Sequence, residues 1–459
     1  MFPGRESSEH FVKKFSNRIS ESYSSDHLDQ VARETGFKQR ESKLTPEIFI
    51  DTILFNELDN GCISLNDHST AIKLRHDVTI SKQGVHDRFN EEACCFVKQL
   101  LDDQLQAQIT GTIDSHALRH FTSVDIKDST RFQLPTELKE FYPGNTGAAT
   151  GAGAHIQFEF DLLSGKIGDL NVTDALRQDN TDARQTLDDI EKGSLILRDL
   201  GYYAISVFEH IHENEAYYIS RIHPHTNIYE SSKDKLINPS TIYNKMKRHG
   251  FTSMEIKVDI SEKKLPVRLI AELLPKKEVE KRLAKTRKEA KKKGREVSEN
   301  YKSRARLNLF ITNVPPEWLS TQCVRKLYQL RWQIELRFKA WKSSYHLEAV
   351  KKMNRYRFEC YLYSNLLHIM INWEIAINFF SIIWKQTGKA LSILKFFKTT
   401  AQHKETFRMA LMEGKAKLRK YLMELFELSC TKLLLEKRNG RTTLSEILHA
   451  NVDTITDLC

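Results

Sequence analysis

The stretch Tyr328-Gln-Leu-Arg331-Trp-Gln-Ile-Glu335-Leu-Arg-Phe-Lys339-Ala-Trp-Lys342 puts one carboxylate among several cations on a single face of a predicted helix. At about 100° per residue, five polar side chains fall within an arc of roughly 80°: Tyr328, Arg331, Glu335, Lys339 and Lys342. The neighbouring arc is apolar and predicts a buried stripe: Leu327, Leu330, Ile334, Phe338 and Trp341. Such a charged face is ordinarily a set of solvated salt bridges. A more specific interpretation is a metal-binding carboxylate beside groups that hold the phosphates of a polyanion.

Composition also favours an acidic partner. The chain has 459 residues, a formal charge of +10 and a pI of about 9.0, so nucleic acid is the leading candidate. Most of the surplus positive charge lies between Lys276 and Arg306, a segment that contains 14 Lys and Arg residues and 5 Asp and Glu residues. This basic arm is either a solubilising lysine-rich segment or a phosphate-contacting one, and composition alone leaves both interpretations open.

Cysteine usage and hydropathy indicate a cytoplasmic protein. The seven cysteines form no C-x-x-C pair, which suits a reducing compartment. The first ten residues are polar and have no apolar signal-peptide region. The most apolar segment, 361–384, carries Glu374 and several Asn residues, so it predicts a buried helix and no membrane span.

Periodicity along the chain predicts helices first and then a sheet. Residues 1–115 are predicted to be helical, and 77–90 resembles part of a helix-turn-helix, although an ordinary helical bundle fits equally well. Strands are then expected at 122–134, 154–163 and 166–173. A polar helix, a short buried strand ending in Asp199, a helix and a further strand follow.

This order matches an α/β fold of the RNase H-like type, interrupted by an insertion before its last helices. Five parts are predicted: a helical DNA-binding domain (1–115), the first part of the core (116–222), a β-rich insertion with the basic arm (223–315), the second part of the core (316–380), and a helical C-terminal region that could serve dimerisation (381–459).

In this topology the first and fourth strands are neighbours, so Asp128 on the first would face Asp199 at the end of the fourth. A helix carrying Glu335 could close the site, and three carboxylates can hold two divalent cations. Among the other acids, Asp125 would lie on the opposite face of the sheet. Asp161 and Asp169 are expected to be surface or turn residues.

At this point the chain resembles a known family, the DDE transposases of bacterial insertion sequences, in the insertion-sequence-four group. The signature of that group is Tyr, two residues, Arg, three residues, Glu, six residues, Lys, and Tyr328, Arg331, Glu335 and Lys342 keep this spacing. Two further blocks of the family resemble Lys127-Asp128-Ser-Thr-Arg-Phe-Gln-Leu-Pro135 and Ile196-Leu-Arg-Asp199-Leu-Gly-Tyr202. The resemblance covers about residues 27–375.

The resemblance implies a transposase that cuts its element from double-stranded DNA and joins it to a target. It implies a metal-binding catalytic triad of Asp128, Asp199 and Glu335, with two Mg²⁺ ions that Mn²⁺ could replace. It also implies a homodimer in the DNA complex. The DNA-contacting residues that it implies are Tyr328, Arg331, Lys339, Lys342 and, less directly, Arg221. No tryptophan can be matched to the one that some members stack on a flipped base, although Trp318 is the nearest in sequence.

Two other functions remain open at this stage. One is an RNase H-like nuclease without strand transfer, and the other is an inactive or domesticated DNA-binding derivative of a transposase. Three intact carboxylates speak against the second, because DNA binding alone does not require them.

Overall fold

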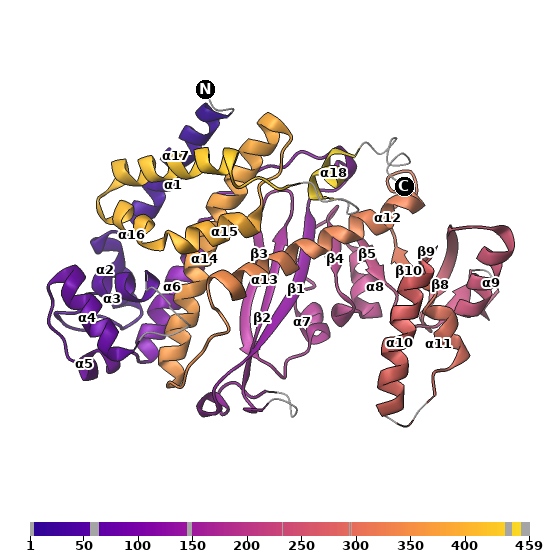
Figure 1. Ribbon diagram of the computed structural model, residues 1–459, viewed down its shortest axis with the longest axis horizontal. Coiled ribbons are helices and arrows are strands. Elements are labelled where there is room, and N and C mark those ends of the chain that lie inside the picture. Colours follow the sequence, from indigo (N-terminus) through magenta and orange to yellow (C-terminus); the bar gives the residue numbers. More distant parts are fainter. Residues whose placement is uncertain are drawn as a thin grey trace. The chain divides into compact units, whose positions relative to one another are not determined.

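The structure is a computed structural model that describes residues 4–55, 64–144, 149–231, 233–292, 294, 296–436 and 443–450. Figure 1 labels its helices and strands in chain order. The chain divides into two compact units. Unit 1 comprises residues 1–114, 129–177 and 334–441, and unit 2 comprises 115–128, 178–333 and 442–459. Each unit is therefore assembled from segments that are far apart in the sequence. The five-part division by function stays a prediction.

Unit 1 combines helices from both ends of the chain with an antiparallel strand pair. Its N-terminal helices are α1 (Arg5–Ser22), α2 (Ser25–Glu34), α3 (Pro46–Leu54), α4 (Leu65–His76), α5 (Lys82–His86) and α6 (Glu91–Gln106). The strands β2 (Gly153–Asp161) and β3 (Ile167–Asp174) follow. Its later helices are α13 (Trp332–Ser344), α14 (Arg355–Thr387), α15 (Ile393–Gln402), α16 (Lys404–Met412) and α17 (Lys415–Thr431).

The long helix α14 forms the core of unit 1. It begins at the cap Asn354 and ends at Gly388, whose φ of 64° favours glycine. Helices α1, α3, α6, α15 and α17 all pack against it. By length and composition α14 could cross a membrane, but 89% of its most apolar window is buried inside the protein. The buried helix predicted for 361–384 is therefore confirmed.

A buried carboxylate on α14 joins two of the N-terminal helices to it. Glu374 is fully buried, and its Oε2 accepts hydrogen bonds from Arg18 Nη2 of α1 at 2.5 Å and Gln104 Nε2 of α6 at 2.7 Å. The backbone N–H of Ile109 donates to Oε1 at 3.1 Å. Burial nevertheless raises the pKa of Glu374 to about 7, and Arg18 and the hydrogen bonds oppose this shift.

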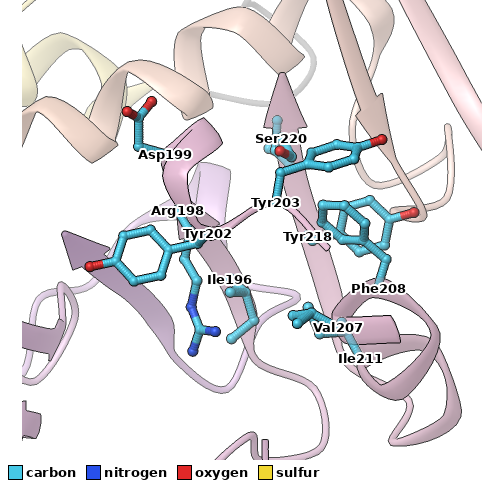
Figure 2. A pocket seen from close by; sticks show the side chains of 11 residues that line it. Ile196, Arg198, Asp199, Tyr202, Tyr203, Val207, Phe208, Ile211, Tyr218 and Ser220 are labelled. Carbon is cyan, nitrogen blue, oxygen red and sulfur yellow. The ribbon is translucent and has the colours of Figure 1, made fainter. Parts of the chain in front are cut away.

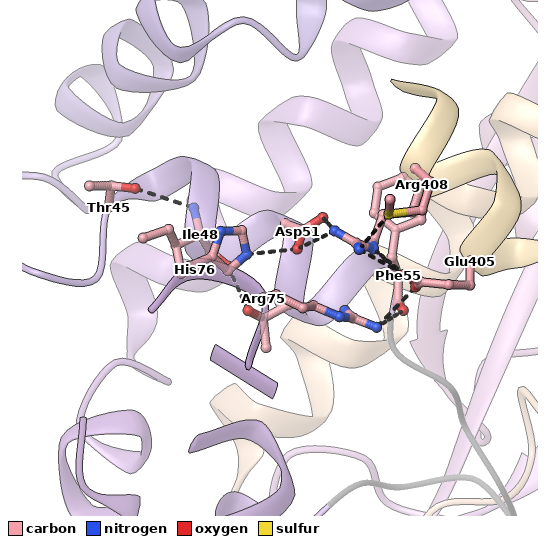
Figure 3. Close-up of polar contacts among 10 residues, drawn as sticks. Thr45, Ile48, Asp51, Phe55, Arg75, His76, Glu405 and Arg408 are labelled. Atoms are coloured by element: carbon pink, nitrogen blue, oxygen red, sulfur yellow. Dashed lines mark hydrogen bonds and ion pairs between the residues drawn. The ribbon is translucent and has the colours of Figure 1, made fainter. Parts of the chain in front are cut away.

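A second polar cluster connects α3 and α4 with α16 (Figure 3). The buried Asp51 of α3 lies between His76 Nε2 at 2.8 Å and Arg408 Nη1 at 3.4 Å. Glu405 pairs with both Arg75, at 3.1 Å, and Arg408, at 2.7 Å. Because charges this buried are costly unless they are paired, these contacts fix the N-terminal helices to the C-terminal ones within one unit.

Unit 2 is built around a mixed sheet. The first half of β1 (Val124–Gln133) lies at one edge of this part of the sheet. The strands that follow, in spatial order, are β4 (Leu195–Arg198), β5 (Tyr217–Arg221), β10 (Leu307–Thr312), β9 (Leu265–Leu273), β8 (Ser253–Ile260), β6 (Ile228–Glu230) and β7 (Lys235–Leu236). Strands β1, β4 and β5 are parallel, and the later pairs are antiparallel. The α/β class predicted from the sequence is therefore confirmed.

The helices of unit 2 are α7 (Asp179–Gln185), α8 (Ile205–Glu213), α9 (Pro239–His249), α10 (Lys276–Lys292), α11 (Glu299–Arg304), α12 (Thr321–Tyr328) and α18 (Leu444–His449). Side chains of α8 and α9, among them Phe208 and Met246, pack into one apolar core with the strands. A single α-helix was predicted over the Tyr328 signature. The structure instead has a 3₁₀ turn at Gln329–Arg331 between α12 and α13. The apolar stripe of this segment is nevertheless buried as predicted.

The Arg18–Glu374 contact makes a testable prediction about stability. A carboxyl whose folded pKa, about 7, exceeds its ordinary value of 4.5 adds stability that is complete below the ordinary pKa and is lost as pH rises through the folded one. Arg18→Met removes the cation that opposes this loss. We expect a destabilisation of about 3 kcal/mol near pH 8 and a clearly smaller one near pH 6, measured by urea unfolding.

The matched control is Arg33→Met, which breaks an exposed contact with Glu41 and should change stability by less than about 0.5 kcal/mol at either pH. A loss from Arg18→Met that is equal at both pH values would mean that Glu374 does not titrate in this range.

Candidate active site

Parallel pairing of β1 with β4 brings two of the predicted catalytic carboxylates to neighbouring positions. The register runs from Val124 opposite Leu195 to Lys127 opposite Arg198. Asp128 is the next residue on β1, and Asp199 directly follows the end of β4. Side chains at matching positions of parallel strands point to the same face of a sheet. Figure 2 shows Asp199 pointing away from the apolar side chains of Ile196 and Val207 beneath it.

The residue before Asp128 fixes which face of the sheet carries the site. Lys127 is fully buried, and its Nζ contacts Asp182 of α7 at 2.8 Å and Thr186 Oγ1 at 3.2 Å. Because side chains alternate along a strand, Asp128 faces away from α7. Asp125 lies on the Lys127 face, as expected, and its Oδ2 accepts a hydrogen bond from Ser123 Oγ at 2.8 Å.

A cation from the signature lies directly on Asp128. Arg331, at the end of the 3₁₀ turn, places Nη1 2.8 Å from Asp128 Oδ2, and both side chains are mostly buried at 13% and 17% exposure. The ion pair neutralises the carboxylate and holds it in one orientation. Arg331 is therefore positioned to modulate the affinity of Asp128 for any other cation.

Tyr328 lies beside the same groups. Its ring is buried and packs edge-on against Phe310 of β10, with 5.4 Å between centroids, and its hydroxyl donates to the carbonyl of Arg198 at 3.4 Å. Burial is the main cause that raises its pKa to about 12. Arg331 and Arg221 oppose that shift, whereas Asp199 adds to it. Tyr328 is consequently a neutral hydrogen-bond donor at physiological pH.

Arg221 ends β5, opposite Phe310 of β10. It borders a pocket of about 280 Å³ whose lining also contains Arg282, Tyr301 and Arg304. Unit 2 thus brings together five of the eight predicted site residues: Asp128, Asp199, Arg221, Tyr328 and Arg331.

The other three predicted residues belong to α13 in unit 1. Glu335 lies in the first turn of α13. Lys339 is exposed. Lys342 donates to the carbonyl of Arg131 at 3.1 Å and pairs with Glu348 at 3.2 Å.

An aromatic cluster anchors α13 to the strands of unit 1. Trp341 packs edge-on against Phe158 of β2, with 4.9 Å between centroids, and the buried Arg337 lies over Phe160 at 4.6 Å and over Trp373 at 5.2 Å. Burial lowers the pKa of Arg337 to about 9. These contacts settle which face of α13 is buried and leave the Glu335 face outside the cluster.

Three further residues considered in the sequence, Asp161, Asp169 and Trp318, contact other parts of the fold. Asp161 accepts hydrogen bonds from the backbone of Leu163 and Ser164 at 3.0 and 2.9 Å, so it is the turn residue that was expected. Asp169 lies within β3 opposite Glu159. Trp318 stacks on His120 with 4.8 Å between centroids, inside a cluster of aromatic side chains.

Sequence reasoning missed Arg282 and Arg304 as individual residues. Both belong to the basic arm, whose charge was evident, but nothing in its composition separates two arginines near Arg221 from the exposed lysines around them. The distinction arises from folding of α10 and α11 against the end of β10.

The chemistry of the donor set is that of a hard cation, because Mg²⁺ takes carboxylate oxygens and water as its ligands. Within the described ranges, no three His, Cys, Asp or Glu side chains are gathered to hold a metal ion. The two aspartates are in unit 2 and Glu335 is in unit 1, so the three-carboxylate site stays a prediction.

Known proteins have sequences similar to this chain. The Transposase DDE domain matches residues 119–371, a range that includes all eight predicted site residues. The transposase of insertion sequence element IS231F from Bacillus thuringiensis subsp. israelensis is 31% identical over 420 residues, covering 86% of this chain and 85% of the relative. The transposase of IS1151 from Clostridium perfringens is 27% identical over 460 residues, covering 95% and 96%.

The domain match extends over more than half of the chain, and the relatives are similar along almost their whole length. Together with paired aspartates on parallel strands and an arginine on one of them, these similarities show that the chain belongs to the DDE transposases of insertion sequences.

Proposed function

We propose that this transposase cuts the ends of its insertion sequence and joins them to target DNA in a cut-and-paste reaction, with Asp128, Asp199 and Glu335 as ligands of divalent cations. The observation that carries the proposal is the parallel pairing of β1 with β4, whose register sets Asp128 and Asp199 beside each other. The same pairing, followed by β5, supports an RNase H-like core.

The proposed cofactor is a pair of Mg²⁺ ions, for which Mn²⁺ could substitute. When bound, such ions would activate a water molecule or the terminal 3′-hydroxyl of the DNA for in-line attack and would stabilise the leaving oxygen. The protein would contribute the oxygen ligands of the three carboxylates. Arg331 holds Asp128 in place through the 2.8 Å contact, and Tyr328 offers a neutral donor beside Asp199.

The cationic residues are proposed to hold DNA phosphates around the reacting bond. In unit 2, Arg331 contacts Asp128 and Arg221 lies near Tyr328, whereas Lys339 and Lys342 belong to α13 in unit 1. Double-stranded DNA, comprising the element ends and the target, is the partner, and the protein is proposed to act on it as a homodimer in the bacterial cytoplasm.

The N-terminal helices are proposed to recognise the element ends. Helix α5 begins at the cap Ser81 and presents the exposed side chains of Lys82 and Gln83, which could contact a base edge or phosphate. It is only five residues long, so a classical recognition helix is not formed by 82–86 alone. Helices α3 and α6 pack on α14, so this region shares its core with the C-terminal helices.

The catalytic assignment predicts loss of cleavage and joining in each of Asp128→Ala, Asp199→Ala and Glu335→Ala. Each change removes a proposed cation ligand, so we expect a decrease on the order of 10³-fold, with binding of end DNA largely kept. The measurement is cleavage and strand transfer of a labelled end duplex in Mg²⁺, beside a binding isotherm.

The matched control is Asp189→Ala, an exposed aspartate ahead of β4, which should cleave like the wild type. Normal cleavage by a folded variant of any of the three carboxylates would remove that residue from the site. Cleavage without joining by the wild type would favour a nuclease.

The Arg331→Ala variant should show whether Arg331 modulates metal binding at Asp128 or has a purely structural role. Removing the guanidinium 2.8 Å from Asp128 removes a competing positive charge, so the Mg²⁺ concentration that gives half-maximal cleavage should fall. The maximal rate should also fall, since a proposed phosphate contact is lost, and the salt slope of binding should decrease by about 1.

Metal titrations of cleavage test this expectation, with Arg248→Ala on the exposed end of α9 as the control. A rate loss with an unchanged metal requirement and an unchanged salt slope would assign Arg331 a structural role only.

End recognition is tested by Lys82→Ala combined with Gln83→Ala, because deletion of residues 1–115 would expose the core of α14. We expect the ratio of affinities for end and scrambled duplexes to fall about tenfold or more, as for loss of base-edge contacts. Lys13→Ala with Lys14→Ala on the exposed side of α1 is the control. An unchanged ratio in the α5 variant would place recognition elsewhere in the protein.

A further inference from the structure

The basic arm does not behave as one uniform surface. Its lysines on α10 are exposed, and Lys285 and Lys288 are examples. Arg282 on the same helix is half-buried, and its Nη2 donates to Asn308 Oδ1 at 2.7 Å and its Nη1 to the carbonyl of Leu307 at 3.3 Å. One side of the arm is therefore folded against β10.

The helix that follows contributes a second arginine to the same place. Arg304, at the end of α11, donates through Nη2 to the carbonyl of Ile222 at 2.7 Å. The Tyr301 hydroxyl and Thr286 Oγ1 are 2.7 Å apart, which ties α11 to α10. These contacts hold Arg282 and Arg304 at the end of β5, where Arg221 lies.

The three arginines line one pocket of about 280 Å³. None of the described residues that line the pocket carries a carboxylate. Apart from the three arginines the lining is mainly apolar and comprises Leu200, Ile222, Pro224, Tyr301, Ala305, Leu307 and Leu309. Since a water occupies about 30 Å³ in the liquid, the pocket has room for a phosphate group and several bridging waters. Leu200 directly follows Asp199, so the pocket adjoins the strand end that carries a proposed catalytic residue.

The guanidinium groups of the three arginines repel one another. Burial lowers the pKa of both Arg282 and Arg304, and Arg221 contributes to each shift. Two carboxylates outside the lining have cationic partners of their own: Glu278 pairs with Lys281 at 2.8 Å, and Glu272 pairs with Arg325 at 3.5 Å. An anion in the pocket would relieve the repulsion among the guanidinium groups, and their planar N–H forks match a phosphate.

We propose that Arg221, Arg282 and Arg304 together form a binding pocket for one backbone phosphate of the bound DNA strand, beside the Asp199 end of β4. The proposal rests on the proposed function, in that it sets the DNA strand next to Asp199. Two arginines of the basic arm thereby serve a defined position on the DNA, whereas its exposed lysines add affinity that does not depend on position.

The test replaces each phosphate of the end duplex in turn by an uncharged methylphosphonate and measures the affinity of the full-length protein without divalent ions. Neutralising one particular phosphate should lower the affinity of the wild type about tenfold or more. The same replacement should leave the affinity of Arg282→Gln and of Arg304→Gln almost unchanged, which is the coupling expected of contacting groups. Lys285→Gln with Lys288→Gln should weaken binding equally at all positions and keep the wild-type profile.

The proposal would be overturned if each phosphate replacement changed the affinity of both arginine variants by the same factor as that of the wild type. Should a glutamine variant fail to fold, Arg282→Lys and Arg304→Lys keep the charge but lose the planar fork, and the loss at the same phosphate should shrink. An undiminished loss in both lysine variants would equally overturn it. Cleavage by the wild type and its loss in Asp199→Ala, measured on the same duplex, report separately on the proposed function.

Discussion

The parallel register of β1 with β4 is the constraint on which the rest of the site depends. It sets Asp128 of β1 beside Asp199, which directly follows β4, and alternation along β1 sends the preceding Lys127 to the opposite face. There Lys127 pairs with Asp182 of α7 inside the protein. A slip of one residue would bury Asp128 and turn Lys127 to the opposite face, so the buried ion pair of Lys127 specifies the register that sets the two aspartates side by side.

Positive charge surrounds the two aspartates at several distances. Arg331 contacts Asp128 directly, Arg221 is close enough to influence Tyr328, and Arg282 and Arg304 border the pocket beyond Arg221. Carboxylates that are to bind cations and a polyanion together require such a balance, because uncompensated negative charge would repel the DNA. Tyr328 stays protonated among these groups since burial raises its pKa.

Unit 1 has a different organising element, the helix α14. Helices from the first hundred residues and from the last hundred pack on it, and the Glu374 and Asp51 contacts lock them together. A region that shares a core with the rest of its unit is expected to transmit the effect of binding through packing, whereas a tethered domain would move independently. Variants that test recognition therefore need surface substitutions.

Local features of the chain could be predicted from the sequence. Strand β1 lies within the predicted range 122–134, the stripe from Leu327 to Trp341 is buried, and the spacing of Tyr328, Arg331 and Glu335 identified the family. These features depend on periodicity and on neighbours within a few residues, which the order of amino acids states directly.

Only the tertiary structure decided which distant residues meet. The contact of Arg331 with Asp128, the 3₁₀ turn in the signature and the gathering of Arg282 and Arg304 near Arg221 all depend on pairing between remote segments. The sequence presented the basic arm as uniform, because composition does not distinguish an arginine folded against β10 from a lysine in solvent. Burial and hydrogen bonding, which are properties of the assembled fold, make that distinction.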